Sequence, residues 1–387
     1  MINNYELYNP TRLIFGENRI EELNQYLPEK AKILFVYGQG SIKRNGIYDR
    51  VIDILKGWEY VEFSGIEPNP VYETLMKAVK LGRENKVDFI LAVGGGSVID
   101  GAKFISAAIP FGDDEPWKLV SEHLEVIESI PLGTILTLPA TGSEMNKGAV
   151  ISNKATGDKL ALISEKLFPV FSILDISVLK SLPKRQIANG VVDAFVHVTE
   201  QYITYPIGAK LQDRFAESIL LTLIEDGQKL YDDIEDKDAG ANVMFCATMA
   251  LNGVLSSGVP TDWSIHMIGH ELTALYNIDH ARSLAIILPA LYNLKINEKL
   301  EKLVQFAERV WKITKGSDIE KAHTAIKYTE NFFKSLGIST KLSKYNIDLD
   351  FTIKSIKEKF ESRGIDNFGE NGIISIDDIE AILHKAK

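Results

Sequence analysis

The spacing of apolar residues changes about halfway along this chain. In the first half, short apolar or alternating runs, which predict strands, are separated by amphipathic stretches, which predict helices. The predicted strands cover residues 5–8, 12–15, 32–37, 58–63, 89–93, 134–138, 149–152, 159–163 and 171–175, and the predicted helices cover residues 17–27, 47–55 and 72–85. This alternation predicts a parallel sheet with helices packed against it.

In the second half, the apolar residues recur almost entirely with helical spacing. Helices are predicted over residues 184–203, 209–231, 238–256, 264–276, 281–293, 298–314, 318–336, 351–358 and 376–385. Residues 363–372 are rich in Gly and Asn and predict an exposed loop before the last helix. Since Leu182 and Pro183 mark the change of pattern, we predict an α/β domain over residues 1–181 and an all-helical domain over residues 182–387.

Composition narrows the class of protein. Hydrophobic residues make up 45% of the chain and charged residues 25%, which is typical of a soluble globular protein. The formal net charge is −10 and no basic cluster occurs, so we expect no nucleic-acid partner. Cys246 is the only cysteine, which excludes an intrachain disulfide and suits a reducing compartment. No apolar run is long enough to span a membrane and no apolar leader is present, so a cytoplasmic protein is expected.

A glycine-rich loop follows the predicted strand at 89–93 and opens a predicted helix. It consists of Gly94, Gly95, Gly96 and Ser97. Backbone N–H groups at such a helix N-terminus bind phosphate, because glycines let the ligand approach closely. The spacing matches neither the G-x-G-x-x-G fingerprint nor a P-loop, and a plain glycine turn is the alternative. Asp100 is expected to brace this loop, and Lys103 to be solvated.

The turn after the predicted strand at 32–37 bears on the choice of dinucleotide. An acidic residue there would hydrogen-bond the adenosine ribose of NAD and repel the 2′-phosphate of NADP. The turn begins at Gly38 and contains no acid, and its Ser41 and Lys43 are able to bind phosphate. We therefore predict that NADP(H) is favoured over NAD(H), with a merely solvated Lys43 and Arg44 as the alternative.

The candidate metal ligands lie between residues 193 and 280. Asp193 and His197 are four apart in a predicted helix, so both face the same side and can reach one ion. Three further histidines follow, namely His266, His270 and His280. Ordinary hydrogen-bonded histidines are the alternative for any single member. Since the cluster lacks cysteine, the predicted site is catalytic rather than structural.

These motifs occur together in a known family. The segments at 94–103 and 137–144, the pair Asp193/His197 and the histidine segments at 266–271 and 279–281 resemble those of the iron-containing (group III) alcohol dehydrogenases. Residues 258–263 look most like the branch with NADPH-dependent aldehyde reductases and butanol dehydrogenases. The resemblance implies a dehydroquinate synthase-like fold, in which a Rossmann-like dinucleotide-binding domain and an all-helical domain border a cleft that holds the active site.

The resemblance also implies roles for individual residues. It assigns Asp193, His197, His266 and His280 to one divalent ion, Fe2+ or Zn2+, whereas the spacing alone leaves His266 and His270 as equal candidates. The position matching His270 lies near substrate and nicotinamide rather than on the metal, which implies a supporting role beside the ligands or a role in proton transfer. A water or a ribose hydroxyl of the cofactor is the alternative proton carrier. By the same resemblance, the cofactor cleft is also lined by Thr137, Thr141 and Lys159. The alternative for Lys159 is a plain surface residue.

The predicted substrate pocket lies between the metal and the nicotinamide. Its candidate residues are Asn146, Ile151, Phe245, Leu255 and Trp263, of which Phe245 and Leu255 are better explained as core. The apolar members suit a short-to-medium unbranched aldehyde. The expected reaction is therefore hydride transfer between NADP(H) and a primary alcohol or aldehyde, catalysed by a homodimer.

Three other functions remain as alternatives. The first is another enzyme of the same fold: a dehydrogenase of glycerol, glycerol phosphate, another polyol or lactaldehyde, or a dehydroquinate-synthase-like lyase. The second is a metal-dependent hydrolase in which the glycine loop holds a phosphorylated substrate. The third is a non-catalytic module with a structural metal, which the absence of cysteine ligands disfavours.

Overall fold

The computed structural model describes residues 1–112 and 115–387. The chain divides into two compact units, each assembled from segments that are distant in the sequence. The sheet unit comprises residues 8–183 and 234–248, and the helical unit comprises residues 1–7, 184–233 and 249–387.

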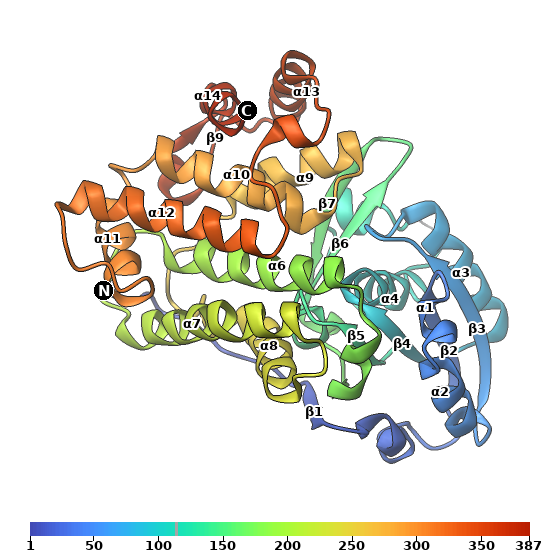
Figure 1. The fold of residues 1–387 in the computed structure, drawn as a ribbon. Coiled ribbons are helices and arrows are strands. Elements are labelled where there is room, and N and C mark those ends of the chain that lie inside the picture. The colour runs from blue at the N-terminus through green and yellow to red at the C-terminus, as the bar shows by residue number, and fades with distance from the viewer. Residues whose placement is uncertain (113–114) are drawn as a thin grey trace. The chain divides into compact units, whose positions relative to one another are not determined.

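A six-stranded parallel sheet forms the centre of the sheet unit, as the alternating pattern predicted. Its order is β1-β8-β5-β4-β2-β3, and Figure 1 shows β5, β4, β2 and β3 lying side by side. The strands are β1 (Arg12–Gly16), β2 (Lys32–Gly38), β3 (Glu59–Ile66), β4 (Phe89–Gly95), β5 (Leu132–Leu138) and β8 (Phe171–Asp175). The inner strands are buried along almost their whole length, which explains their continuous apolar runs.

The strand order reverses direction between β2 and β4. The chain passes from β2 to β3 on one side, and then crosses to β4 on the other side of β2. Because all these strands are parallel, their carboxyl ends share one edge, where β2 ends at Gly38 and β4 ends at Gly95. Open α/β sheets bind ligands outside the carboxyl ends of the strands at such a reversal.

Helices and one hairpin complete the sheet unit. The helices are α1 (Ser41–Arg44), α2 (Ile47–Leu55), α3 (Tyr72–Asn85), α4 (Gly96–Ala108) and α5 (Lys118–Ser121). The hairpin pairs β6 (Gly148–Asn153) with β7 (Asp158–Ile163) in antiparallel fashion. Helix α4 is buried along nearly its whole length because it is apolar on most sides and packs between β4 and β6. Its first residue is therefore firmly placed at the edge of the sheet.

The helical unit is built around α6 (Lys184–Tyr202), which is almost completely buried from Gly190 to Tyr202. It packs against α7 (Lys210–Asp232) and α10 (His280–Leu294), and α10 packs in turn against α9 (Ser264–Tyr276). The remaining helices are α8 (Lys237–Ala250), which runs from one unit into the other, α11 (Leu300–Arg309), α12 (Asp318–Ser335), α13 (Leu349–Ser362) and α14 (Asp378–Ala386). Among the described residues, no helix is long and apolar enough to cross a membrane.

Several local predictions were wrong. Residues 5–8 form no strand, and the helix predicted at 17–27 is a short 3₁₀ helix, Arg19–Gln25. The helix predicted at 238–256 ends at Ala250, shortly before Gly253 adopts a left-handed φ of 96°. The segment 363–372 is not simply an exposed loop, because its Phe368 and Glu370 are buried. The segment contains β9 (Asn367–Phe368), which pairs in antiparallel fashion with β10 (Ile374–Ser375) just after it.

Candidate metal centre and dinucleotide site

Helix α6 carries the first two candidate metal ligands. Asp193 and His197 lie one turn apart on the same face, and both side chains are buried. Glu200 follows near that face and is fully buried as well. Because α6 is enclosed by neighbouring helices, these side chains are held in place by packing.

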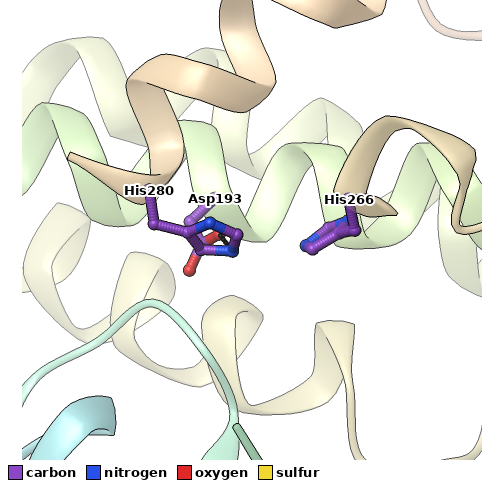
Figure 2. Close-up of side chains that lie close together, drawn as sticks. All are labelled: Asp193, His266 and His280. Atoms are coloured by element: carbon purple, nitrogen blue, oxygen red, sulfur yellow. Dashed lines mark ion pairs between the residues drawn. The ribbon is translucent and has the colours of Figure 1, made fainter. Parts of the chain in front are cut away.

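His266 on α9 and His280 at the first residue of α10 complete a compact cluster with Asp193. One ligand atom from each of the three residues can be chosen so that all lie within 4.8 Å of one another. His280 Nε2 is 3.6 Å from Asp193 Oδ1. Figure 2 shows the rings of His266 and His280 turned toward each other, with the Asp193 carboxylate beside His280. Three separate helices therefore deliver one carboxylate and two imidazoles to one point.

His197 lies directly beside this cluster. Its Nε2 is 4.0 Å from Asp193 Oδ1, and its ring stacks on that of His266 with centroids 4.7 Å apart. Burial lowers the pKa of His197 to about 4, although Asp193 opposes this effect. A neutral imidazole is the form that binds a metal, and His197 Nδ1 finds no hydrogen-bond partner among the described residues. The site thus fits a divalent ion such as Fe2+ or Zn2+, while the four-ligand set stays a prediction.

The start of α10, and with it His280, is tied to α6. Asp279 Oδ2 accepts hydrogen bonds from Arg185 Nε at 2.7 Å and from Asn189 Nδ2 at 2.8 Å. Although burial raises the pKa of Asp279, the bonds from Arg185 and Asn189 lower it overall. Asn189 lies one helical turn before Asp193, so this contact brings His280 next to the Asp193 carboxylate.

His270 lies at the border of the cluster, one turn after His266 on α9. Its ring centroid is 5.0 Å from that of His280 and 5.8 Å from that of His266. It is half-buried, whereas His266 is buried. Its role in proton transfer, as opposed to metal binding, stays a prediction.

A buried carboxylate that the sequence pattern did not reveal holds His266. Glu200 Oε1 accepts the backbone N–H of Ile265 at 2.7 Å, and Glu200 Oε2 hydrogen-bonds His266 Nδ1. Burial raises the pKa of Glu200 well above its usual value. With Nδ1 engaged in this way, an ion would be bound through Nε2 of His266. The spacing of seven residues between Asp193 and Glu200 was the only sequence indication of this contact.

The proposed pocket residues occupy different surroundings. Trp263 precedes α9 with a left-handed φ of 65°, and its ring centroid is 5.3 Å from that of His266. Ile151 is fully buried in the core of the sheet unit. Asn146 is engaged locally, since it donates to Gly142 O and accepts from Lys103 Nζ. Their contact with substrate stays a prediction. Phe245 was expected in the core but is 44% exposed, so that expectation was wrong.

The glycine loop joins β4 to α4 at the reversal of strand order. Gly94 and Gly95 end β4, and Gly96 begins α4. A Cβ atom on Gly96 would lie 2.2 Å from Thr141 Oγ1, and one on Gly94 would lie 2.5 Å from Val98 Cγ2. Only glycine permits this close packing. The loop thus presents the N-terminus of a long helix at the edge of the sheet, as an anion site requires.

Asn69 links two of the predicted cofactor residues. Its backbone N–H donates to Ser97 Oγ at 3.2 Å, and its Oδ1 accepts from Lys159 Nζ at 2.9 Å. Lys159 is 7% exposed, so the alternative of a plain surface residue was wrong. Asn69 adopts a left-handed φ of 55° between two prolines.

Asp100 and Lys103 on α4 reach the loop that contains Thr141. Asp100 Oδ1 accepts from Ser143 Oγ at 2.6 Å, and its Oδ2 accepts the backbone N–H of Val150 at 2.9 Å. Asp100 therefore braces this region. Lys103 is fully buried and donates to Ser143 Oγ, so the prediction of a solvated side chain was wrong.

The residues chosen for cofactor preference lie near the carboxyl end of β2. Ser41 begins α1 and is exposed. Thr137, which is predicted to line the cofactor cleft, lies instead near the end of β5. Lys43 Nζ is 3.2 Å from Glu62 Oε1 and 4.4 Å from the centroid of the Tyr48 ring. The turn itself lacks an acid, but β3 supplies Glu62 beside it.

Comparison with known proteins identifies the class of enzyme that this architecture serves. A family model described as iron-containing alcohol dehydrogenase matches residues 10–176, and one described as the C-terminal part of the Fe-containing alcohol dehydrogenase family matches residues 187–387. The chain belongs to the iron-containing alcohol dehydrogenase family, and the predicted fold class and oxidoreductase class are confirmed.

Particular relatives cover essentially the whole chain. It is 54% identical over 388 residues to the NADPH-dependent aldehyde reductase YqhD of Escherichia coli, with 100% of each chain covered. It is 40% identical to NADH-dependent butanol dehydrogenase A of Clostridium acetobutylicum, covering 97% of this chain and 98% of the relative. The crystal structure of Escherichia coli YqhD has a TM-score of 0.98 at 53% identity and covers 100% of this chain and 99% of its own. That of NADH-dependent butanol dehydrogenase A from Thermotoga maritima has a TM-score of 0.94 at 33% identity, with the same coverage.

Proposed function

We propose that this enzyme reduces aldehydes with NADPH, and oxidises primary alcohols in the reverse direction, at a divalent ion held by Asp193, His197, His266 and His280. The observation that carries the proposal is the convergence of Asp193, His266 and His280 within 4.8 Å, with His197 packed against them. Identity of 54% with a relative named an NADPH-dependent aldehyde reductase supports the substrate class and the cofactor.

The donor set suits carbonyl chemistry. A divalent ion bound there would supply a Lewis acid that polarises an aldehyde oxygen and stabilises the corresponding alkoxide. One carboxylate and three neutral imidazoles leave a net positive charge at the ion. His270 lies beside two of the ligands and is the side chain that we propose to deliver the proton to the substrate oxygen.

The sheet unit supplies the groups that we propose to bind the dinucleotide. The N-terminus of α4 would hold the pyrophosphate at Gly95, Gly96 and Ser97. Thr137, Thr141 and Lys159 would orient the nicotinamide half, with Asn69 fixing Lys159. Hydride transfer then requires the nicotinamide carbon to reach the substrate carbon with water excluded.

We propose Lys43 as the residue that favours NADPH. Hydrogen bonding with Tyr37 and Glu62 raises the pKa of Lys43, so its ammonium group remains charged and would attract a 2′-phosphate. Lys43→Met is expected to raise KM for NADPH several-fold while leaving KM for NADH nearly unchanged. Lys56→Met is the matched control, since Lys56 is exposed and pairs with the neighbouring exposed Asp53. An equal rise in both KM values would contradict this role for Lys43.

The decisive assay uses protein reconstituted separately with Fe2+ and with Zn2+. Loss of nicotinamide absorbance is followed with NADPH and with NADH over a series of unbranched aldehydes, and glycerol is tested in the oxidative direction. We expect kcat/KM to be higher with NADPH and with aldehydes such as butanal. A better rate with glycerol, or equal or better use of NADH, would overturn the corresponding part of the proposal. The homodimer and the cytoplasmic location stay predictions.

A further inference from the structure

A fully buried lysine lies near the metal cluster in the helical unit. Lys299 Nζ donates to Asp262 Oδ2 at 2.5 Å, to Glu370 Oε1 at 2.8 Å and to the backbone oxygen of Ile203 at 3.0 Å. Its side chain is 0% exposed, and those of Asp262 and Glu370 are 3% and 2% exposed. Removing ions from water costs several kcal/mol for each, so such a cluster persists only when its members are well paired.

Hydrogen bonds connect this cluster to His266, one of the proposed metal ligands. Asp262 Oδ1 accepts the backbone N–H of Ser264 at 2.9 Å, and the Asp262 N–H donates to the backbone oxygen of Glu200 at 2.9 Å. The Glu200 carboxylate in turn bonds the Ile265 N–H and His266 Nδ1. The turn at 262–264 and the first residues of α9 are thus connected by hydrogen bonds to one point on α6.

The C-terminal part of the chain contributes to the same cluster. Glu370 belongs to a short 3₁₀ helix, Glu370–Gly372, far in sequence from the ligands. Gly369 before it has a left-handed φ of 74°, and a Cβ there would lie 3.0 Å from Asp262 Oδ1. The segment therefore lies closely against the turn that precedes α9.

We propose that Glu200 is the positioning residue that aims His266 at the metal ion, and that Lys299 with Asp262 and Glu370 holds the turn that keeps Glu200 and His266 in register. This inference rests on the metal site of the proposed function. Glu200 cannot shift freely, because its Oε1 is fixed by the Ile265 N–H. A carboxylate bonded to the far nitrogen of a ligating imidazole sets the orientation and the basicity of that ligand, and its loss typically weakens metal affinity by about 10–100-fold.

The test measures metal affinity rather than turnover. Zn2+ binding to the metal-free full-length chain is determined by competition with a chelator, and the visible spectrum of the Co2+ form reports the ligand field. Glu200→Gln is expected to bind Zn2+ about 10–100-fold more weakly and to alter the Co2+ spectrum. Glu217→Gln is the matched control: Glu217 on α7 is also buried, and its hydrogen bonds within the described part of the chain come from Tyr202, Gln305 and Arg309 rather than from a proposed ligand. It should leave both readouts unchanged.

A double-mutant cycle separates positioning from general stabilisation. If Glu200 acts through His266, Glu200→Gln should cause no further loss of Zn2+ affinity in a His266→Ala background. Should Glu200→Gln not fold, Glu200→Asp keeps the carboxyl group but retracts it, and should show the same losses in smaller measure. Wild-type affinity and spectrum in Glu200→Gln, or additive losses in the cycle, would overturn the inference while leaving the metal site intact. Failure of the wild-type chain to bind Zn2+ stoichiometrically would overturn both this inference and the proposed metal site.

Discussion

The Lys103 ammonium group lies 2.9 Å from Asn146 Oδ1 and is completely enclosed by protein. It also donates to the backbone oxygens of Asn146 and Gly148, at 2.9 and 2.7 Å, and to Ser143 Oγ. Burial lowers the pKa of Lys103 to about 8, and the nearby Asp100 and Glu144 carboxylates oppose that effect. Since Lys103 belongs to α4, it joins the helix that begins at the glycine loop to the loop after β5.

Replacing Lys103 tests the strength of this connection. Lys103→Met is expected to lower the free energy of unfolding by about 3–5 kcal/mol, because a buried cation is removed while its acceptors and neighbouring acids remain buried. Chemical denaturation followed by circular dichroism measures the change. The control is Lys147→Met, in which a 46% exposed lysine paired with Glu165 is lost and little change is expected. Equal stabilities of the two variants would show that Lys103 is not a structural cation.

The glycine loop can be tested by adding a single methyl group. Gly96→Ala would place Cβ 2.2 Å from Thr141 Oγ1, which forces the loop apart from its neighbour. We expect a loss of stability of about 1–3 kcal/mol and a marked rise in the Kd for NADPH, measured by fluorescence titration. Gly57→Ala is the control, since the nearest atom there is the Ile54 carbonyl oxygen at 3.9 Å. Unchanged NADPH binding in Gly96→Ala would exclude the loop as the phosphate site.

Elements with a clear apolar period were predicted well from the sequence. The helices expected at 47–55, 72–85 and 264–276 coincide with α2, α3 and α9. The strands expected at 89–93 and 171–175 match the buried β4 and β8. These segments bury a continuous apolar face, so their pattern alone specifies their structure. The structure of the segment 363–372 was not predicted correctly, because it depends on the hydrogen bond from Lys299 to Glu370 rather than on a periodic pattern of apolar residues.

The site was only partly predictable, for a related reason. The acid and histidine positions of the metal cluster stand out because these residue types suit metal binding at helical spacing. Glu200 and Lys299 were overlooked, and Lys103 was wrongly predicted to be solvated, because charged residues normally lie in water and only the folded chain shows which of them are buried. Lys299 is 37 residues from Asp262 and 71 residues from Glu370 in the sequence. Glu200 and His266 are 66 residues apart. Sequence spacing carries no information about such pairs.

A buried aspartate at the end of β8 should make stability depend on acid. Asp175 accepts hydrogen bonds from the backbone N–H groups of Asn18, Ile20 and Ser177. It also forms an ion pair with Arg50, whose Nη2 is 2.8 Å from Asp175 Oδ2. Although burial raises the pKa of Asp175, these bonds lower it overall below 3.8. A lowered pKa in the folded state means that the carboxylate stabilises the fold above the unfolded-state value, and that this contribution is lost as pH falls below it.

Asp175→Asn measures that contribution. We expect it to reduce the free energy of unfolding at neutral pH by about 1.5–3 kcal/mol, the usual value for hydrogen bonds to a charged group. The difference from the wild type should shrink as pH falls below 3.8, where the wild-type carboxylate becomes protonated in the unfolded chain. Urea denaturation at a series of pH values provides the data. Asp53→Asn, which changes a 71% exposed carboxylate, serves as control and should have no comparable effect.

The proposed role of His270 in proton transfer can be separated from metal binding by mutation. It lies beside His266 and His280 yet is more accessible than His266, a position suited to exchanging protons with a substrate oxygen. His270→Ala should lower kcat by about 10²–10⁴-fold, the usual contribution of a general acid or base, and leave one equivalent of metal bound. Stopped-flow reduction of butanal and metal analysis of the same sample measure both quantities. His323→Ala, which alters a histidine bonded to Asn293 on the surface of α12, should change neither. Loss of stoichiometric metal in His270→Ala would instead make His270 a ligand, because removing a proton donor does not remove a coordinate bond.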